Sequence, residues 1–386
     1  MTILTVGQSP HLNTSLSKLH RDFISGLKTD NHIETIATLH DISFFLPNQS
    51  GIFEYDGAKI HPFLDDRGAL SAFCINVMKN VQPNIVITFG ERKEHNFMSV
   101  LKSFYPNLFK WIAVVTTVGP FSSDIYELNL ADAIVVTNKA AYASLGINSI
   151  TNTKIFYNPV GVDDKIFALE SKNRKFSATY VCRNTLESNP GVFINTTAKS
   201  HIGSYLHSNI DDNGDYNLER LISQCGAGEY VSLPNNFVSV KEGLPDKILN
   251  DIYNAHFLVL DCSMQSKTGV SMIEGMLSGC VPVGPNFGAV GDIIESLPEE
   301  YRFFVPYEKI MWYKEEEAAV VSEEGLMRVF KEIKHKFMND KDWRKNAAQK
   351  MREMALNFSK ENFIQRTKRI IESVAGTENA ILVDSY

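Results

Sequence analysis

Short apolar runs alternate with longer amphipathic stretches along this chain, and this alternation is the feature that most limits its fold. The first run, residues 3–6, turns at residues 7–10 and leads into residues 15–27, where apolar side chains recur at the spacing of one helical face. Such alternation is typical of a parallel sheet wrapped by helices, because parallel strands need long crossover connections. The sequence therefore predicts an α/β fold.

The alternation occurs twice, on either side of a turn-rich segment at residues 159–163. In the first half it predicts strands at 3–6, 33–39, 85–89, 111–116 and 133–137, and helices at 15–27, 69–81, 96–104 and 139–145. In the second half it predicts strands at 177–182, 229–233, 257–260 and 281–283. A chain of 386 residues also exceeds the roughly 250 to 300 at which one core stops growing. We therefore expect two Rossmann-like domains, residues 1–160 and 161–357, followed by a C-terminal helical segment, 358–386.

Composition excludes several classes of protein. The formal charge of −7 gives no overall positive field toward nucleic acid or anionic lipid, although a local basic groove stays open as an alternative. The five cysteines are scattered without a C-x-x-C pair, which predicts buried thiols and no metal site. The start of the chain lacks the pattern of a secretory signal, and no stretch is apolar enough to span a membrane. We expect a cytoplasmic protein.

The segment at residues 244–294 carries the clearest chemical pattern. A helix at 246–255 and a strand at 257–260 lead into a polar loop, 261–268. Gly269 then allows a close backbone approach, and a new helix begins around Val270 and Ser271. The free N–H groups at this helix start predict a site for a diphosphate, with Glu274 one turn further on. The alternative is purely structural, since a helix ended by glycine (here Gly279) before a buried strand is common in α/β proteins.

The same segment resembles the donor-binding region of the large retaining GT-B glycosyltransferase family, which includes sucrose synthases. The family pattern is E-G-F-G-x-x-x-x-E-A-M-A-x-G-x-P-V-V, followed by G-G-x-x-E-I-I. Here the matching residues are 266–269 (SKTG), 274–283 (EGMLSGCVPV) and 288–294 (GAVGDII). The resemblance implies a GT-B fold and assigns the donor to seven residues beside a phosphate-binding arginine: Ser266, Lys267, Thr268, Gly269, Val270, Ser271 and Glu274.

Three other segments fall in the order that the family requires. Residues 158–163 (NPVGVD) with Phe167 look like the hinge that opens the second domain. Residues 180–183 (YVCR) look like the strand end that presents an arginine, here Arg183, to the donor phosphates. Residues 358–363 (FSKENF) resemble the segment where the last helix returns to the first domain. The resemblance covers the chain from about residue 158 onward and is topological before it.

The chain also departs from the family pattern. Ser266 stands where the first glutamate of the E-x7-E pair is usual, which implies altered sugar recognition. The lysine that follows the phosphate-binding arginine is missing, and Lys267 is its possible replacement or a solvated side chain.

The family's His-Asp pair near the sugar is missing as well, and residues 116–119 (TTVG) occupy the comparable place. The candidates for that role are His95, with Glu91 and Arg92 beside it, and Gln8 in the opening loop. The resemblance also implies that Gly7 and Gln8 bind the donor, because the first β-α loop of family members binds the acceptor or the donor phosphate. The alternative for His95 is a helix-capping surface residue.

The resemblance implies a retaining, metal-independent transfer of a sugar from a nucleotide-diphosphate donor, most often a UDP-sugar, with no cofactor. Arg183 and Glu274 are its catalytic residues, joined by His95, and the nucleotide base lies near Leu233 and Asn235. The first domain then binds an acceptor of unknown identity: a glycan, lipid, protein or small molecule. A modified base of phage DNA is a minority option, because the first half offers only loose basic groups, Arg92, Lys93, Lys102 and Lys110. Two rival readings are a catalytically silent GT-B module that binds a nucleotide sugar or a partner, and a nucleotide-sugar epimerase.

Overall fold

The chain forms two compact units. The computed structural model describes residues 1–10, 14–38, 51–63, 69–119, 128–147, 153–171, 174–208, 210, 214–234, 244–311 and 317–376. The first lobe comprises Met1–Gly161 together with Lys360–Tyr386, and the second lobe comprises Val162–Ser359. The divisions expected from the sequence lie at 160/161 and 357/358.

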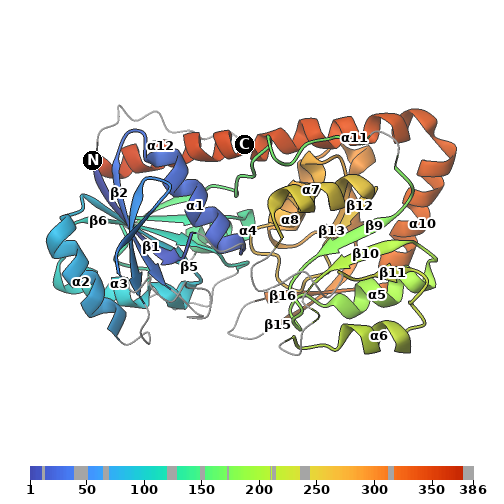
Figure 1. The fold of residues 1–386 in the computed structure, drawn as a ribbon, viewed down its shortest axis with the longest axis horizontal. Helices are drawn as coiled ribbons and strands as arrows, with labels where there is room; N and C mark the ends of the chain where they lie inside the picture. The colour runs from blue at the N-terminus through green and yellow to red at the C-terminus, as the bar shows by residue number, and fades with distance from the viewer. Residues whose placement is uncertain are drawn as a thin grey trace. The chain divides into compact units, whose positions relative to one another are not determined.

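An eight-stranded sheet forms the first lobe, in the order β3-β4-β2-β1-β5-β6-β7-β8 (Figure 1). Its strands are β1 (Thr2–Gln8), β2 (His32–Thr38), β3 (Phe53–Tyr55), β4 (Ala58–Phe63), β5 (Ile85–Gly90), β6 (Lys110–Val115), β7 (Ala133–Val136) and β8 (Lys154–Tyr157). All neighbouring strands are parallel except in the β3–β4 hairpin. The chain therefore starts in the middle of the sheet, builds outward through β2 and β4, and crosses back to β5.

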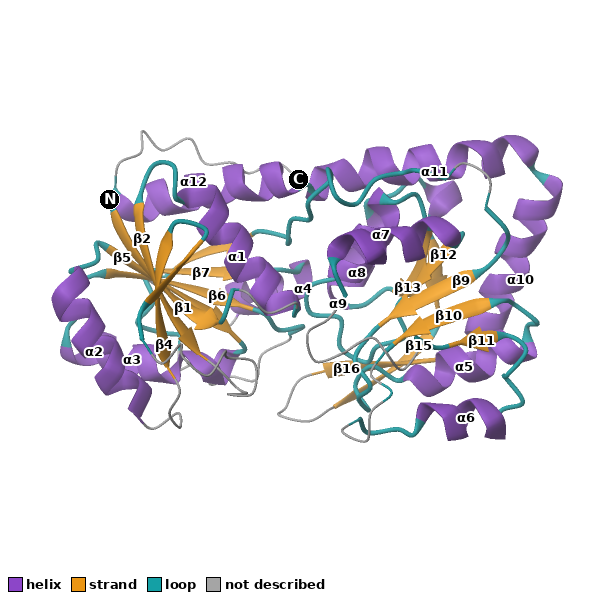
Figure 2. Cartoon of the chain, in the orientation of Figure 1, coloured by secondary structure: helices purple, strands orange, loops and turns teal. Residues whose placement is uncertain are grey.

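Helices cover both faces of this sheet (Figure 2). One face carries α1 (Ser15–Leu27) and α12 (Lys360–Ala375), and the other carries α2 (Leu70–Val81), α3 (Asn96–Phe104) and α4 (Lys139–Ile147). The Phe23 and Phe363 rings join α1 to α12 with 5.2 Å between their centroids, and a Cβ on Gly26 would overlap Ile364. The last helix thus belongs to the core of the first lobe.

A six-stranded parallel sheet forms the second lobe, in the order β11-β10-β9-β12-β13-β14. The strands are β9 (Ala178–Val181), β10 (Ser204–His207), β11 (Val231–Ser232), β12 (Leu258–Leu260), β13 (Val281–Pro285) and β14 (Phe303–Val305), and a separate hairpin joins β15 (Tyr307–Met311) to β16 (Glu317–Val321). In order of appearance the six strands lie 3-2-1-4-5-6, which is the Rossmann arrangement. The predicted α/β class and its two Rossmann-like sheets are confirmed.

The helices of the second lobe also flank its sheet. They are α5 (Pro190–Lys199), α6 (Leu218–Gln224), α7 (Asp246–Ala255), α8 (Val270–Leu277), α9 (Gly288–Glu295), α10 (Glu323–Asn339) and α11 (Lys341–Ala355). Figure 2 shows α7 and α8 over one face and α5 and α6 over the other. Gly275 lets α8 approach β12 closely, because a Cβ there would lie 2.8 Å from the Cβ of Val259.

The sequence missed several strands, namely β3, β4, β8, β10, β14, β15 and β16. Most of them are only three to five residues long, and β10 mixes polar and apolar residues. Runs this short give no clear two-residue period, and β-pairing with a neighbour decides their conformation. The predicted strand at 229–233 is also shorter in the structure, where β11 holds two residues.

We expect the close approach of α8 to β12 to limit substitution at Gly275. Gly275→Ala should lower the free energy of unfolding by about 1 to 3 kcal/mol, because the added methyl group meets Val259 on the facing strand. Gly203→Ala is the matched control, since a Cβ at that position has no neighbour within 4 Å. Urea unfolding of both variants measures the difference, and equal stabilities would contradict this view of the packing.

Candidate functional site

The candidate site lies at the carboxyl edge of the second-lobe sheet, where β9 and β12 are neighbours. Tyr180 of β9 pairs with Leu260 of β12, so both strands end at about the same level. From this point the chain runs outward on one side through β10 and β11, and on the other through β13 and β14. In open α/β sheets, ligands bind outside the carboxyl ends of the strands at the point where the strand order reverses. We call residues 182–189 and 261–269 the switch-point loops.

The two switch-point loops are tied to each other. The backbone N–H of Met264 donates to the carbonyl oxygen of Glu187 at 2.7 Å. The Lys267 ammonium lies 3.4 Å from the Glu187 carboxylate. Glu187 thus fixes one loop against the other. Its carboxylate also keeps the Lys267 ammonium at this edge of the sheet.

Asp261 organises the loop after β12 from inside. Its carboxylate, 7% exposed, accepts hydrogen bonds from the Ser263 N–H at 2.7 Å, from the Ser263 hydroxyl and from the Ser266 hydroxyl. Burial raises the pKa of Asp261 above its usual value, and these hydrogen bonds act against that shift. The Ser266 carbonyl accepts from the Ala289 N–H at 2.9 Å, at the start of α9. Ser266, which stands in place of the family's first glutamate, is therefore built into the loop.

The loop ends at Gly269, whose backbone adopts the left-handed conformation, φ 64° and ψ 18°. Any other residue there would have a strained backbone, and its Cβ would also overlap Ile293. Both effects favour glycine at this position. Helix α8 begins at the next residue, with no side chain capping its first turn. Within the described part of the chain, the N–H groups of Val270 and Ser271 donate to no protein acceptor. Two amides and the positive helix terminus therefore face the loop, an arrangement that suits an anion.

Arg183 lies in the other switch-point loop, one residue beyond Cys182. The Cys182 N–H donates to the His207 carbonyl at 3.0 Å, which continues the sheet ladder up to this point. The Arg183 side chain is exposed, and it forms no ion pair with any residue that the structure describes. A guanidinium in this state is able to bind a phosphate in bidentate fashion.

Glu274 points into the lobe from α8. Its side chain is 3% exposed, and its Oε2 accepts a hydrogen bond of 3.0 Å from the hydroxyl of Tyr253 on α7. Burial, and then the charge of Glu274, raises the pKa of the Tyr253 hydroxyl well above its usual value. Tyr253 therefore stays protonated and fixes the Glu274 carboxylate. The sequence did not identify Tyr253, because no local pattern links residues on two different helices.

The remaining predicted residues are spread over both lobes. Leu233 is half-buried just after β11, and Asn235 lies outside the described residues. In the first lobe, Gln8 accepts hydrogen bonds of 2.8 Å from the Thr14 hydroxyl at its side-chain oxygen and of 2.8 Å from His20 Nδ1 at its carbonyl. Gly7 packs so closely on β5 that a Cβ would lie 3.0 Å from that of Phe89. Gly7 and Gln8 end β1 at the carboxyl edge of the first sheet.

His95 is a buried core residue. It is 0% exposed, its Nδ1 lies 2.7 Å from the Thr88 hydroxyl, and its Nε2 lies 3.3 Å from the carbonyl oxygen of Gly90. The Trp111 indole donates to the same Thr88 hydroxyl at 2.9 Å, so Thr88 donates in turn to His95 Nδ1, and Nε2 carries the proton. Burial lowers the pKa of His95 to about 4.

The alternative of a capping surface residue is wrong for His95, because the residue is buried and its side chain makes no cap hydrogen bond to α3. The buried position and its hydrogen bonds favour a structural role for His95.

Two of the basic groups considered for a DNA acceptor, Lys102 and Lys110, lie away from the carboxyl edge of the sheet, whereas Arg92 follows the carboxyl end of β5. Lys102 is 6% exposed, and both Lys102 and Lys110 bind Asp132, at 2.9 and 3.0 Å, near the amino ends of β6 and β7. Lys102 and Lys110 therefore do not contribute to a basic groove at the carboxyl edge.

The described residues contain no group of three or more His, Cys, Asp or Glu side chains that is arranged to hold a metal ion. Among the described helices, none is both long and apolar enough to cross a membrane.

The two Rossmann-like lobes and the returning last helix define the GT-B class of fold, that of many glycosyltransferases. Sucrose-phosphate synthase from Thermosynechococcus elongatus is similar over 98% of this chain and 100% of its own, with 14% identity and a TM-score of 0.74. HepE from Anabaena, solved with UDP-glucose, is similar over 97% and 100%, with 14% identity and a TM-score of 0.72. The pneumococcal O-GlcNAc transferase GtfA, solved with UDP and GlcNAc, is similar over 97% and 99%, with 12% identity and a TM-score of 0.64.

At these identities the likeness shows the fold. No protein-family model matches the sequence, and no curated protein sequence matches it.

Restoring the family's glutamate should harm this particular site. Ser266→Glu would bring a second carboxylate against the buried Asp261, and we expect it to cost about 2 to 4 kcal/mol of stability, against about 1 kcal/mol for Ser266→Ala. Thermal unfolding of the two variants at pH 7 measures the difference. A Ser266→Glu protein as stable as Ser266→Ala would show that the loop has room for the carboxylate.

The buried neutral His95 should make the first lobe sensitive to acid. The unfolded state binds a proton near pH 6.5 and the folded state only near pH 4, so stability present above pH 6.5 is lost as pH falls through this window. Between pH 7 and pH 5, protonation of His95 in the unfolded state should alone lower the free energy of unfolding by about 2 kcal/mol. In His95→Asn the fall between these two pH values should be smaller by that amount, as measured by urea unfolding. An unchanged pH dependence would mean that folding does not lower the pKa of His95.

Proposed function

We propose that this protein is a glycosyltransferase, which moves a sugar from a nucleotide-diphosphate donor, a UDP-sugar in the first instance, to an acceptor hydroxyl. The observation that carries the proposal is the junction at the β9–β12 switch point. There, an exposed arginine stands on one loop, and the unoccupied amides of a helix start stand on the loop tied to it. The solved proteins of the same fold include HepE with UDP-glucose and GtfA with UDP and GlcNAc, which supports a nucleotide-sugar as the ligand class.

In this proposal the diphosphate binds the N–H groups of Val270 and Ser271, and Arg183 binds it from the neighbouring loop. As the bond between sugar and phosphate breaks, negative charge accumulates on the leaving diphosphate. Arg183, Lys267 and the two amides stabilise that charge, and preorganised donors of this kind lower a barrier by on the order of a few kcal/mol each. Cationic side chains and amides then do the work that a divalent ion does in other transferases, so we expect the reaction to proceed without Mg²⁺.

Glu274 has the positioning part in this proposal. Tyr253 holds its carboxylate within the lobe at 3.0 Å, which leaves it little freedom to turn. A carboxylate held in this way accepts hydrogen bonds from the hydroxyls of a ribose or a sugar at small entropic cost. The nucleotide base then reaches toward Leu233 after β11, and Thr268 borders the diphosphate. The family resemblance further implies that the anomeric configuration is retained.

Slow hydrolysis of the donor tests this mechanism without knowledge of the acceptor. With UDP-, GDP- and ADP-sugars as substrates, Arg183→Ala should lower kcat/KM by on the order of 100-fold. Glu274→Gln keeps the bond to Tyr253 and should lower it by roughly 10- to 100-fold. Arg220→Ala, an exposed arginine on α6, is the matched control and should hydrolyse the donor as the parent protein does. Added EDTA should have no effect, and the anomer of a transfer product reports on retention.

A catalytically silent module is the second candidate, favoured by the burial of His95 and by Ser266 in place of a glutamate. Such a module would bind the nucleotide sugar, lose that binding in Arg183→Ala, and show no turnover with any acceptor. Epimerised sugar in the same assay would instead favour the epimerase. Failure of every nucleotide sugar to bind would contradict the proposal as a whole.

A further inference from the structure

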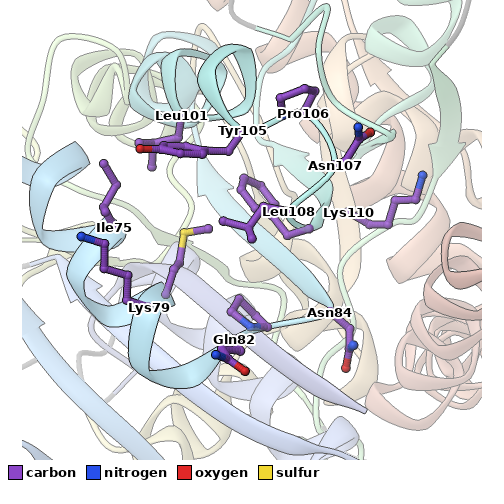
Figure 3. Close-up of a pocket in the computed structure, with 13 residues that line it drawn as sticks. Ile75, Lys79, Gln82, Asn84, Leu101, Tyr105, Pro106, Asn107, Leu108 and Lys110 are labelled. Carbon is purple, nitrogen blue, oxygen red and sulfur yellow. The ribbon is translucent and has the colours of Figure 1, made fainter.

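A second feature that suits binding lies in the first lobe, at the edge of the sheet opposite the one that carries Gly7 and Gln8. It is a pocket of about 640 Å³ between the ends of α2 and α3 and the starts of β5 and β6. Figure 3 shows Tyr105 and Pro106 along one wall, Ile75 and Lys79 of α2 along another, and Leu108 between them. Nothing in the proposed transfer reaction uses this edge.

Large apolar side chains are exposed at this pocket and directly before it in the chain. Phe104 is 74% exposed, Leu108 61% and Tyr105 44%. They follow one another in a single turn, and we call Phe104, Tyr105, Pro106 and Leu108 the amino-edge patch. Single exposed apolar residues are ordinary, whereas adjoining ones usually mark an interaction surface.

The backbone holds the amino-edge patch outward. Helix α3 ends at Phe104, and Pro106 cannot continue it. The N–H of Leu108 donates to the Tyr105 carbonyl at 3.3 Å, which closes the turn, and the N–H of Lys110 donates to the Asn84 carbonyl at 3.0 Å, which fixes it to the sheet. The exposed rings thus stand on an anchored turn.

The surroundings of the patch carry excess positive charge. Asp132 is bound by both Lys102 and Lys110, at 2.9 and 3.0 Å, so one carboxylate serves two ammonium groups. Lys79 adds an exposed ammonium at the end of α2, on the other side of the pocket. The whole chain has a formal charge of −7, so this positive surface is opposite in sign to the net charge of the protein.

We infer that the amino-edge patch docks on the surface of a lipid bilayer that contains anionic lipids. Phe104, the most exposed of these groups, is not among the residues that line the pocket, and Tyr105 and Leu108 line it while staying largely exposed, which suits insertion among lipid chains better than enclosure of a small molecule. Lys79 and Lys110 then meet the anionic head groups, and the Tyr105 ring lies at the boundary between water and lipid. This inference is independent of the proposed transfer reaction.

Co-sedimentation with vesicles tests the docking. The full chain should bind vesicles of phosphatidylcholine and phosphatidylglycerol more tightly than vesicles of phosphatidylcholine alone, and the difference should shrink as salt is raised. The double variant Phe104→Ser, Leu108→Ser should bind at least tenfold more weakly, and Lys79→Gln about fivefold more weakly. Met338→Ser on α10 removes a side chain that is 64% exposed elsewhere and should bind as the parent protein does.

The substituted side chains are exposed, so all these variants should keep the parent's unfolding temperature and its donor hydrolysis. Equal binding to neutral and anionic vesicles, or an equal loss in Met338→Ser, would overturn the inference. Binding of monomeric octyl phosphate without any affinity for vesicles would also overturn it and would assign the pocket to a small amphipathic ligand.

Discussion

The pairing of β12 with β9 is the constraint on which the candidate site depends. β12 is held on both sides, with Leu258 opposite Ala178 of β9 and opposite Val281 of β13. Because β12 is fixed in this way, the loop that follows it is delivered beside the loop that follows β9, and α8 starts at a defined place over the sheet. The bond from Met264 to Glu187 and the buried Asp261 then set the shape of the loop. The anion binding that we propose for this loop depends on backbone geometry more than on a set of special side chains.

Local rules explain what the sequence could predict. The alternation of apolar runs identifies most of the central strands and helices, since each depends on its own residues and on burial. Gly269 and the start of α8 were predictable for the same reason, because a left-handed residue before a helix is a local requirement. The end of β12 and the polar loop after it were predicted in the same way, whereas the pairing of β12 with β9 was not.

The rest depends on contacts between residues far apart in the chain. The hydrogen bond between Tyr253 and Glu274 joins two helices, and the one between Asp261 and Ser266 depends on how a loop folds back. His95 was read from sequence as a polar group near a strand end, yet Thr88 and Gly90 satisfy it inside the core. Residue type alone cannot tell a histidine that faces a ligand from one that packs under a sheet.

A short connection joins the two ends of the second lobe. Val162 and Ser359 form an isolated bridge, the Val162 N–H donates to the Phe358 carbonyl at 2.9 Å, and Arg352 binds the carbonyl of Phe167 at 2.9 Å. In terms of evolution and engineering, residues 162–359 therefore resemble a domain inserted into a host whose sequence resumes with α12. A segment whose termini adjoin is well suited to separate expression or to circular permutation, because a few linker residues suffice to close it. The host, in turn, is discontinuous, and it is complete only when both of its pieces have been synthesised.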